Sequence, residues 1–291
     1  MAMRDREIEF TTFDKGLWLK KISDIYLHYS AEREAEDISF SFHSSLMRGA
    51  MEPLHVVTYA CLIHYLIGKG HIVRQNLRNK DIFDYIFQEL NFAAYWRGGK
   101  NHVEAASSHN IFNLWRIVET EKDMYAKQVE QYFKRTYFAD RDLSAVSISL
   151  VEAFYNVFDH AEADGNAFSI IFYNEKTQIL SYAVSDFGIG IPTSVRRMLP
   201  DIDKDTDAIN WAIKDTSTVR STARNKGYGM SNILASAQIA RIFSNHGLLV
   251  KTQDMFKSHT IDDFFFPGTI IYLEIDMSTF EKEEVLDTFT I

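Results

Sequence analysis

The spacing of apolar and polar residues changes along the first part of the chain. Residues 38–42 alternate apolar with polar side chains, as a half-buried strand does, whereas residues 56–67 are apolar almost throughout, which is typical of a buried helix. A short strand is expected at residues 71–75, followed by a helix that Asp81 caps and whose apolar side chains keep helical spacing as far as Leu90. Strands that alternate with helices favour an α/β unit.

The pattern after residue 140 predicts a second unit with longer elements. A charged amphipathic helix at residues 118–138 is expected to join the two units. Helices are expected at about 142–163 and 229–243, and strands at 168–173, 179–185, 248–252 and 269–275. We therefore divide the chain into an α/β domain at residues 1–115, a connecting helix at 116–140 and a larger domain at 141–291, in an α/β (α+β sandwich) fold.

The composition narrows the classes of protein to consider. Of the 291 residues, 31 are Lys or Arg and 40 are Asp or Glu, which gives a net charge of −9 and disfavours general nucleic-acid binding. Cys61 is the single cysteine, so an internal disulfide and a two-cysteine metal site are excluded, and a reducing, cytoplasmic compartment is expected. The most apolar window, residues 55–68, is shorter than the roughly 20 residues that span a bilayer, so we expect no membrane partner.

One polar stripe follows the helix predicted at about 142–163. Glu152, Asn156, Asp159 and His160 stand at positions i, i+4, i+7 and i+8, so their side chains lie along one face of an otherwise apolar helix. The solvated face of an ordinary amphipathic helix has the same pattern. The stripe alone therefore leaves open whether these residues are functional.

Two glycine-rich turns come later in the chain. Asp186 ends a predicted strand, from which its carboxylate can point into a pocket, and Gly188 and Gly190 follow at a spacing that lets the backbone approach a ligand closely. Lys226 and Gly227 stand at the opening of a predicted helix, where free N–H groups and the positive end of the helix dipole favour phosphate. Such turns also occur in ordinary loops, so neither decides the function by itself.

Taken in order, these elements and the pair Gly268–Thr269 before the last predicted strand resemble the sequence boxes of the GHKL ATPase superfamily, whose members include gyrase, histidine kinases and MutL. Residues 152–161 look like the N box, and residues 186–192 and 227–230 look like the two glycine boxes. The Asn-x-x-x-His-Ala form of residues 156–161 is most similar to the branch of anti-sigma-factor serine kinases. The resemblance implies a Bergerat-type ATP-binding fold, with helices on one face of a mixed sheet.

The resemblance also implies roles for individual residues. Asn156 would coordinate a Mg²⁺ ion that bridges the phosphates, and Glu152, one helical turn earlier, would orient or deprotonate the attacking water or hydroxyl. Asp186 would accept a hydrogen bond from the amino group of adenine and so favour ATP over GTP. The other residues expected around the nucleotide are Asp159, His160, Gly188, Gly190, Arg220, Lys226, Gly227, Tyr228, Gly229, Met230 and Thr269.

The connection at about residues 193–226 is expected to be a lid over the nucleotide, since unstructured connections longer than about 12 to 15 residues are usually functional or disordered. Arg220 and Lys226 are its candidates to reach the γ-phosphate, although a solvated loop accounts for either residue as well. Two positions depart from the family's pattern: Met230 replaces a leucine, and Phe187 stands where many relatives have asparagine.

Residues 1–115 are similar to the second half of a STAS domain, the fold of anti-sigma-factor antagonists, in their order of strands and helices. In those antagonists a phosphoacceptor serine stands just before the middle helix. Residues 51–55 contain no serine, and Ser44 and Ser45 lie too early in the chain to replace it well. The resemblance therefore implies a STAS-like fold without the usual phosphoacceptor.

Together these resemblances imply a Mg-dependent, ATP-hydrolysing regulatory switch, in which ATP orders the lid and controls contact with a regulatory protein partner; a homodimer is one form this contact can take. Two alternatives stay open. They are a serine/threonine protein kinase of the anti-sigma-factor type acting on a STAS-like partner, and an ATP-binding module without turnover. A histidine kinase is disfavoured, because no histidine before the N box is followed by Asp or Glu.

Overall fold

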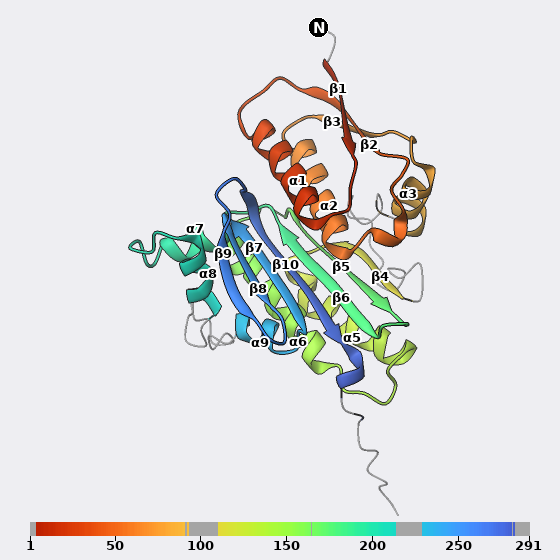
Figure 1. Cartoon of the computed structure of the whole chain (residues 1–291), viewed down its shortest axis with the longest axis vertical. Helices are drawn as coiled ribbons and strands as arrows, with labels where there is room; N and C mark the ends of the chain where they lie inside the picture. The colour runs from red at the N-terminus through yellow and green to blue at the C-terminus, as the bar shows by residue number, and fades with distance from the viewer. Residues whose placement is uncertain are drawn as a thin grey trace, which may run out of the picture.

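The computed structural model describes residues 4–90, 92, 110–163, 165–213, 229–280 and 282, with the backbone alone for Asp159, His160, Gly229, Met230 and Asn232. It contains a small sheet of three strands, in the order β1-β2-β3, and a large sheet of seven strands, in the order β4-β5-β6-β10-β7-β8-β9. The small sheet and its helices lie above one end of the large sheet (Figure 1). The expected α+β class is confirmed.

The small sheet is built from consecutive βαβ units, and both of its strand pairs are parallel. Its elements along the chain are β1 (Arg4–Phe10), α1 (Lys15–Ser30), β2 (Glu36–Phe42), α2 (Pro53–Gly68) and β3 (Ile72–Gln75). The local sequence sets where the helices begin. The side chain of Asp14 accepts a hydrogen bond from the N–H of Leu17 at 2.9 Å, and Pro53 opens α2, where no N–H is needed. We call residues 4–92 the N-terminal unit.

Every pair of neighbouring strands in the large sheet is antiparallel. In their spatial order the strands are β4 (Ile111–Arg116), β5 (Ala167–Asn174), β6 (Ile179–Asp186), β10 (Phe266–Asp276), β7 (Ile239–Asn245), β8 (Gly247–Lys251) and β9 (Phe256–Thr260). The expectation of a mixed sheet is therefore wrong for the described strands. Short turns join β5 to β6 and link β7, β8 and β9, and hairpins of this kind pair their strands antiparallel.

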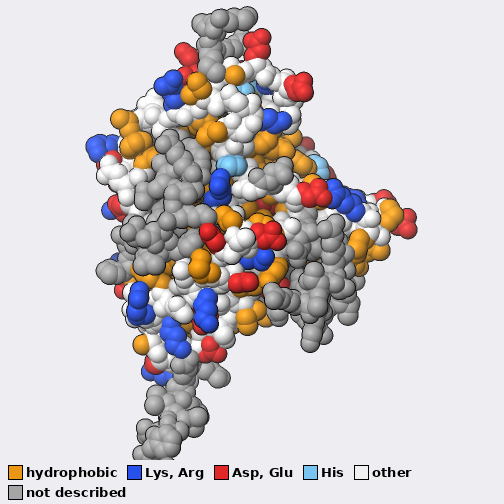
Figure 2. All heavy atoms as spheres, turned by 180° about the vertical axis from the view of Figure 1, so that it is seen from behind, with side chains coloured by type: hydrophobic (Ala, Val, Ile, Leu, Met, Phe, Trp, Pro, Cys, Tyr) orange, Lys and Arg blue, Asp and Glu red, His pale blue; other side chains and the backbone are white. Residues whose placement is uncertain are grey.

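The helices of the second half share one face of the large sheet. They are α5 (Lys122–Thr136), α6 (Ser144–Asn156), α7 (Gly190–Arg196), α8 (Asp205–Ile213) and α9 (Gly229–Ala235). The Ser149 hydroxyl of α6 lies 2.7 Å from the Tyr182 hydroxyl of β6, and the amide of Asn210 in α8 donates to the Ser258 hydroxyl of β9 at 2.8 Å. We call this side of the sheet the α6 face. Seen from behind, the molecule carries acidic and basic side chains interspersed over its described surface (Figure 2).

Helix α2 lies between the two sheets. The Tyr59 ring packs against Phe40 of the small sheet, with ring centroids 5.6 Å apart, whereas the Cys61 thiol donates to the carbonyl oxygen of Ser185 in β6 at 3.4 Å. Residues 53–63 are all buried, as the apolar run predicts, and Cys61 packs in the core. Because α2 covers β5 and β6 on the side opposite α6, the expectation of helices on one face describes only the second half of the chain.

The expected boundary at residue 115 cuts through β4. This strand pairs with β5 and so belongs to the large sheet, although the sequence division assigned most of it to the first domain. The expected connecting helix is also more than a connector, because α5 buries Tyr125, Val129 and Phe133 and packs against α6. Local sequence patterns carry no record of such long-range pairing, and a single cluster of buried apolar side chains spans both sheets.

Several predicted elements differ in type or in their bounds. The helix predicted at 229–243 ends at Ala235, and residues 239–245 form β7 instead, a strand buried between β10 and β8. An apolar run of this length fits both a buried strand and a buried helix. Helix α3 (Lys80–Asp84) is capped by Asn79, whose side chain accepts from the N–H of Ile82 at 3.2 Å, so Asp81 lies within the helix and not at its cap. A π-helical turn, η2 (Tyr85–Glu89), continues it.

The segment expected to be a lid is partly helical. Residues 205–213 form α8, whereas residues 214–226 lie outside the described part of the chain. Strands β1 and β9 and helices α1 and α7 had no counterpart in the predicted elements. In the described residues we find no helix with the length and apolar character needed to cross a bilayer.

Candidate functional site

A row of polar residues marks one end of the large sheet. Thr269 of β10 pairs with Asp186 of β6 on one side and with Ser244 of β7 on the other, so the three side chains emerge on the same face. That face carries α6, because Asp186 and Tyr182 are an even number of residues apart on one strand. The Ser244 hydroxyl lies 3.1 Å from the Thr269 hydroxyl and donates to the carbonyl of Gly268 at 2.9 Å. The predicted pair Asp186 and Thr269 is thus brought together.

The carboxyl group of Asp186 is buried at the end of β6, with 3% of the residue exposed. Its Oδ1 accepts a hydrogen bond from the N–H of Gly188 at 2.9 Å, and the backbone of Thr269 contributes a second one. Burial raises the pKa of Asp186 to about 7, although both backbone hydrogen bonds act to lower it. A buried acceptor whose charge changes near neutral pH is a candidate for ligand recognition.

Two glycines let the backbone close tightly around this carboxyl group. A Cβ atom on Gly188 would lie 2.0 Å from the carbonyl oxygen of Ala161. Gly268 has a φ of +78°, and a Cβ there would lie 2.3 Å from the carbonyl oxygen of Asp186. No larger residue fits either position without moving backbone, so the sequence pattern at both glycines reflects close approach.

The end of helix α6 meets the glycine loop. After Asn156 the helix widens into a π-helical turn, η5 (Val157–Ala161), and ends at Glu162, whose φ is 51°. The carbonyl oxygen of Ala161 accepts a hydrogen bond from the N–H of Ile189 at 2.7 Å. Such π-turns are frequent at functional sites. The predicted N box and first glycine box are therefore joined directly.

Glu152 and Asn156 lie in the last turns of α6, and both are half-buried. The amide nitrogen of Asn156 donates to the carbonyl oxygen of Glu152 at 3.0 Å. This contact orients the Asn156 side chain and leaves its amide oxygen as the atom suited to a cation. Among the described residues no group of three or more His, Cys, Asp or Glu side chains is arranged around a metal position.

The predicted second glycine box lies only partly within the described residues. Gly229 and Met230 begin α9, and α9 packs against α6. Arg220, Lys226, Gly227 and Tyr228 fall outside the described residues. The backbones of Asp159 and His160 lie within η5.

Two residues next to this site, Ser244 and Asn245, are not predicted by any sequence motif. Asn245 has a φ of 51°, and its amide donates to the Thr193 hydroxyl at 3.1 Å. Its buried Oδ1 finds no hydrogen-bond partner within the described part of the chain. A Cβ on Gly190 would lie 2.5 Å from that oxygen. The only sequence signal for them is a Ser-Asn pair at the end of an apolar run, and that run predicts a helix as readily as a strand.

Comparisons of the chain with models of protein families, with curated proteins and with solved structures each found no match. The chemistry of the site is therefore taken from its geometry. A buried carboxyl group between two strand ends, with glycine backbone packed around it, can accept hydrogen bonds from N–H groups on a flat ligand. The adjoining end of α6 supplies a carboxylate and an amide.

Proposed function

We propose that the chain binds Mg·ATP at the end of α6 and the strand ends of β6 and β10, and hydrolyses it as a regulatory switch. The observation that carries this proposal is the environment of Asp186. A buried carboxyl group on the sheet, bounded by Gly188 and by the Gly268–Thr269 pair, matches what recognition of the adenine amino group requires. A guanine would present a carbonyl oxygen to the same acceptor, so ATP would be preferred over GTP.

The residues present at the end of α6 fit the needs of a Mg²⁺-bound triphosphate. Asn156 would hold the ion through its amide oxygen, since its nitrogen is already bound to the Glu152 carbonyl. The ion would neutralise charge on the phosphates when bound. Glu152 would accept a proton from the attacking water, and its place one turn before Asn156 puts both side chains on one side of the helix.

The switch would act through the elements around the nucleotide. Helix α7 begins at Gly190, directly after the loop that holds Asp186, and packs against η5 and α8. Occupancy of the site would favour one arrangement of α7 and α8, and a regulatory protein partner or a second copy of the chain would bind that arrangement preferentially.

Two other functions would use the same residues. In a protein kinase of the anti-sigma-factor type, Glu152 would deprotonate a serine hydroxyl of a STAS-like partner, and the γ-phosphate would pass to that oxygen. In a module without turnover, ATP binding alone would set the conformation. The hydrolytic switch, the kinase and the module differ in the fate of the γ-phosphate, which passes to water, passes to a protein hydroxyl or stays on ATP.

Incubation of the full chain with γ-labelled ATP and Mg²⁺ separates the three. Free labelled phosphate in the absence of other proteins supports the hydrolytic switch. Label on an added STAS-domain protein supports the kinase, and saturable binding without release or transfer supports the module. Absence of ATP binding at millimolar nucleotide contradicts all three.

A further inference from the structure

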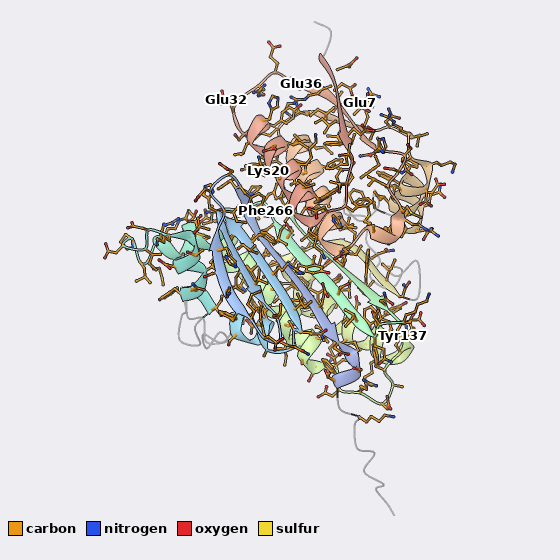
Figure 3. All side chains as sticks on the ribbon, in the orientation of Figure 1. Glu7, Lys20, Glu32, Glu36, Tyr137 and Phe266 are labelled. Carbon is orange, nitrogen blue, oxygen red and sulfur yellow. The ribbon has the colours of Figure 1, made fainter. Side chains whose placement is uncertain are left out.

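The side chain of Phe187 leaves the proposed nucleotide site and enters the N-terminal unit. Its ring centroid lies 5.5 Å from that of Tyr26 in α1 and 6.2 Å from that of Tyr65 in α2, both edge to face. It also lies 5.7 Å from Phe266, which Figure 3 labels at the upper end of β10, just below Lys20 of α1. Aromatic pairs with this geometry contribute beyond the area they bury. Phe187, where many relatives of the resembled family have asparagine, thus joins the glycine loop to α1 and α2.

Hydrogen bonds also connect the same stretch of backbone to α2. The Cys61 thiol in α2 donates to the carbonyl oxygen of Ser185 at 3.4 Å. The N–H of Phe187 donates to the carbonyl oxygen of Asn166 at 3.1 Å, and the amide of Asn166 donates to the carbonyl of Cys61 at 3.1 Å. Both chain neighbours of Asp186 are therefore fixed, directly or through Asn166, by the N-terminal unit.

The alternation of side chains along β6 explains why this matters for the site. Ser185 and Phe187 bracket Asp186, and the N-terminal unit holds the face opposite the one to which Asp186 points. A shift of the Phe187 ring would therefore act on the backbone that carries the carboxyl group. The backbone on the other side is packed closely at Gly188 and Gly268, where no Cβ fits, so a displacement at Phe187 would be passed to the Asp186 carboxyl group through direct contacts.

We propose that Phe187 is a positioning residue, through which the N-terminal unit sets the orientation of Asp186 and with it the preference of the site for adenine nucleotides. The inference rests on the proposed function. Helices α1 and α2 then contribute to nucleotide specificity. A ligand or partner that binds the N-terminal unit would change the affinity of the site for nucleotide. The coupling runs through packed side chains with known contacts.

The test is calorimetric titration of the full chain and of Phe187→Ala with Mg·ATP and with Mg·GTP. We expect Phe187→Ala to bind ATP about tenfold more weakly while its GTP affinity changes little, so that the ratio of the two affinities falls. Phe187→Leu, which fills part of the space, restores part of the ratio. Tyr26→Ala removes the opposite side of the contact and gives the same result if Phe187→Ala does not fold, as checked by its thermal transition.

Phe83→Ala is the matched control. Phe83 is also half-buried and stacks on Phe87 at 4.8 Å in the N-terminal unit, away from the glycine loop. It should lower thermal stability and leave both affinities unchanged. A parent chain that binds no ATP refutes the proposed function itself. A folded Phe187→Ala that keeps the parent's affinities, or that loses ATP and GTP equally, overturns the positioning role while the proposed function stands.

Discussion

The N-terminal unit and the upper end of the large sheet bury polar groups in different ways. In the N-terminal unit, two pairs of buried side chains bond to each other: the Trp18 indole donates to the Thr58 hydroxyl at 2.8 Å, and the Tyr29 hydroxyl donates to the Glu36 carboxylate at 2.7 Å. At the end of the large sheet, Asp186 is held by backbone N–H groups, and its pKa is raised by burial. Polar burial therefore supports the fold in the first region. In the second it costs stability and leaves an acceptor suited to a ligand.

The largest effect is expected at the end of the large sheet, where a substitution of Glu152 should lower turnover without lowering ATP affinity. Replacing Glu152 by Ala removes the proposed general base, so we expect turnover to fall about 100- to 10,000-fold with ATP affinity retained. Phosphate release and equilibrium nucleotide binding measure the two quantities. Equal rates of phosphate release for the variant and the parent would contradict the role assigned to Glu152.

Glycine substitutions compare the two regions directly. Gly188→Ala forces a Cβ to within 2.0 Å of the Ala161 carbonyl, whereas a Cβ on Gly49 in the N-terminal unit meets nothing within 4 Å. We expect Gly188→Ala to lower the free energy of unfolding by about 3 kcal/mol and to abolish ATP binding, since backbone must move. Gly49→Ala should change neither quantity measurably. Denaturant unfolding and nucleotide titration check both, and similar behaviour of the two variants would remove the contrast.

The pH dependence of stability tests the cost of burying Asp186. Its folded pKa of about 7 exceeds the ordinary value of 3.8, so between these values the folded chain keeps a proton that the unfolded chain releases. The stability contributed by this proton is fully present below about pH 4 and is lost as the pH rises through about 7. From pH 5 to pH 8 we expect the free energy of unfolding of the parent to fall by about 2 to 3 kcal/mol relative to that of Asp186→Asn.

The same substitution should weaken ATP binding, because a new amide oxygen that keeps the hydrogen bond from the Gly188 N–H would leave the NH₂ group, a donor, to face the amino group of adenine. Urea unfolding at several pH values, combined with nucleotide titration, measures both consequences. Parallel pH profiles for the parent and Asp186→Asn would show that Asp186 does not titrate in this range.

The smallest effect is expected in the N-terminal unit. Thr58→Val removes the acceptor of the buried Trp18 indole and leaves its N–H without that partner. We expect a loss of about 1 to 3 kcal/mol in the free energy of unfolding, with ATP affinity unchanged. Chemical denaturation and calorimetric titration are the measurements. If Thr58→Val lowered ATP affinity as much as Asp186→Asn does, buried polar groups of the N-terminal unit would serve ligand binding as well as stability, and the contrast between the two regions would fail.

The sequence predicted much of the local structure but little of the pairing between distant segments. The apolar run of α2 and the strands β5, β6 and β10 were identified at nearly their observed bounds, because local periodicity determines them. The pairing of β4 with β5 was missed, since no local pattern marks a partner more than 50 residues away. The apolar run of β7 satisfies both the helical and the strand period, so its prediction as a helix is wrong.

At the candidate site, too, the sequence predicted local motifs but not the contacts between distant segments. Asp186, Gly188 and Thr269 were singled out from motifs, and their mutual contact in the fold was not contained in any local pattern. Phe187 was noted only as a departure from a family's usual residue. Its ring lies against Tyr26, which is far away in sequence, so its surroundings became visible only with the fold.

The position of α2 between the two sheets makes the two halves of the chain depend on each other for stability. A helix that is covered by a sheet on each side belongs to both, and removing the first 92 residues would uncover the apolar surface of β5 and β6. A shortened gene product would aggregate unless another layer replaced this cover. The two halves should therefore be retained or lost together in descendants of this chain, and recombination at residue 115 should yield no stable protein.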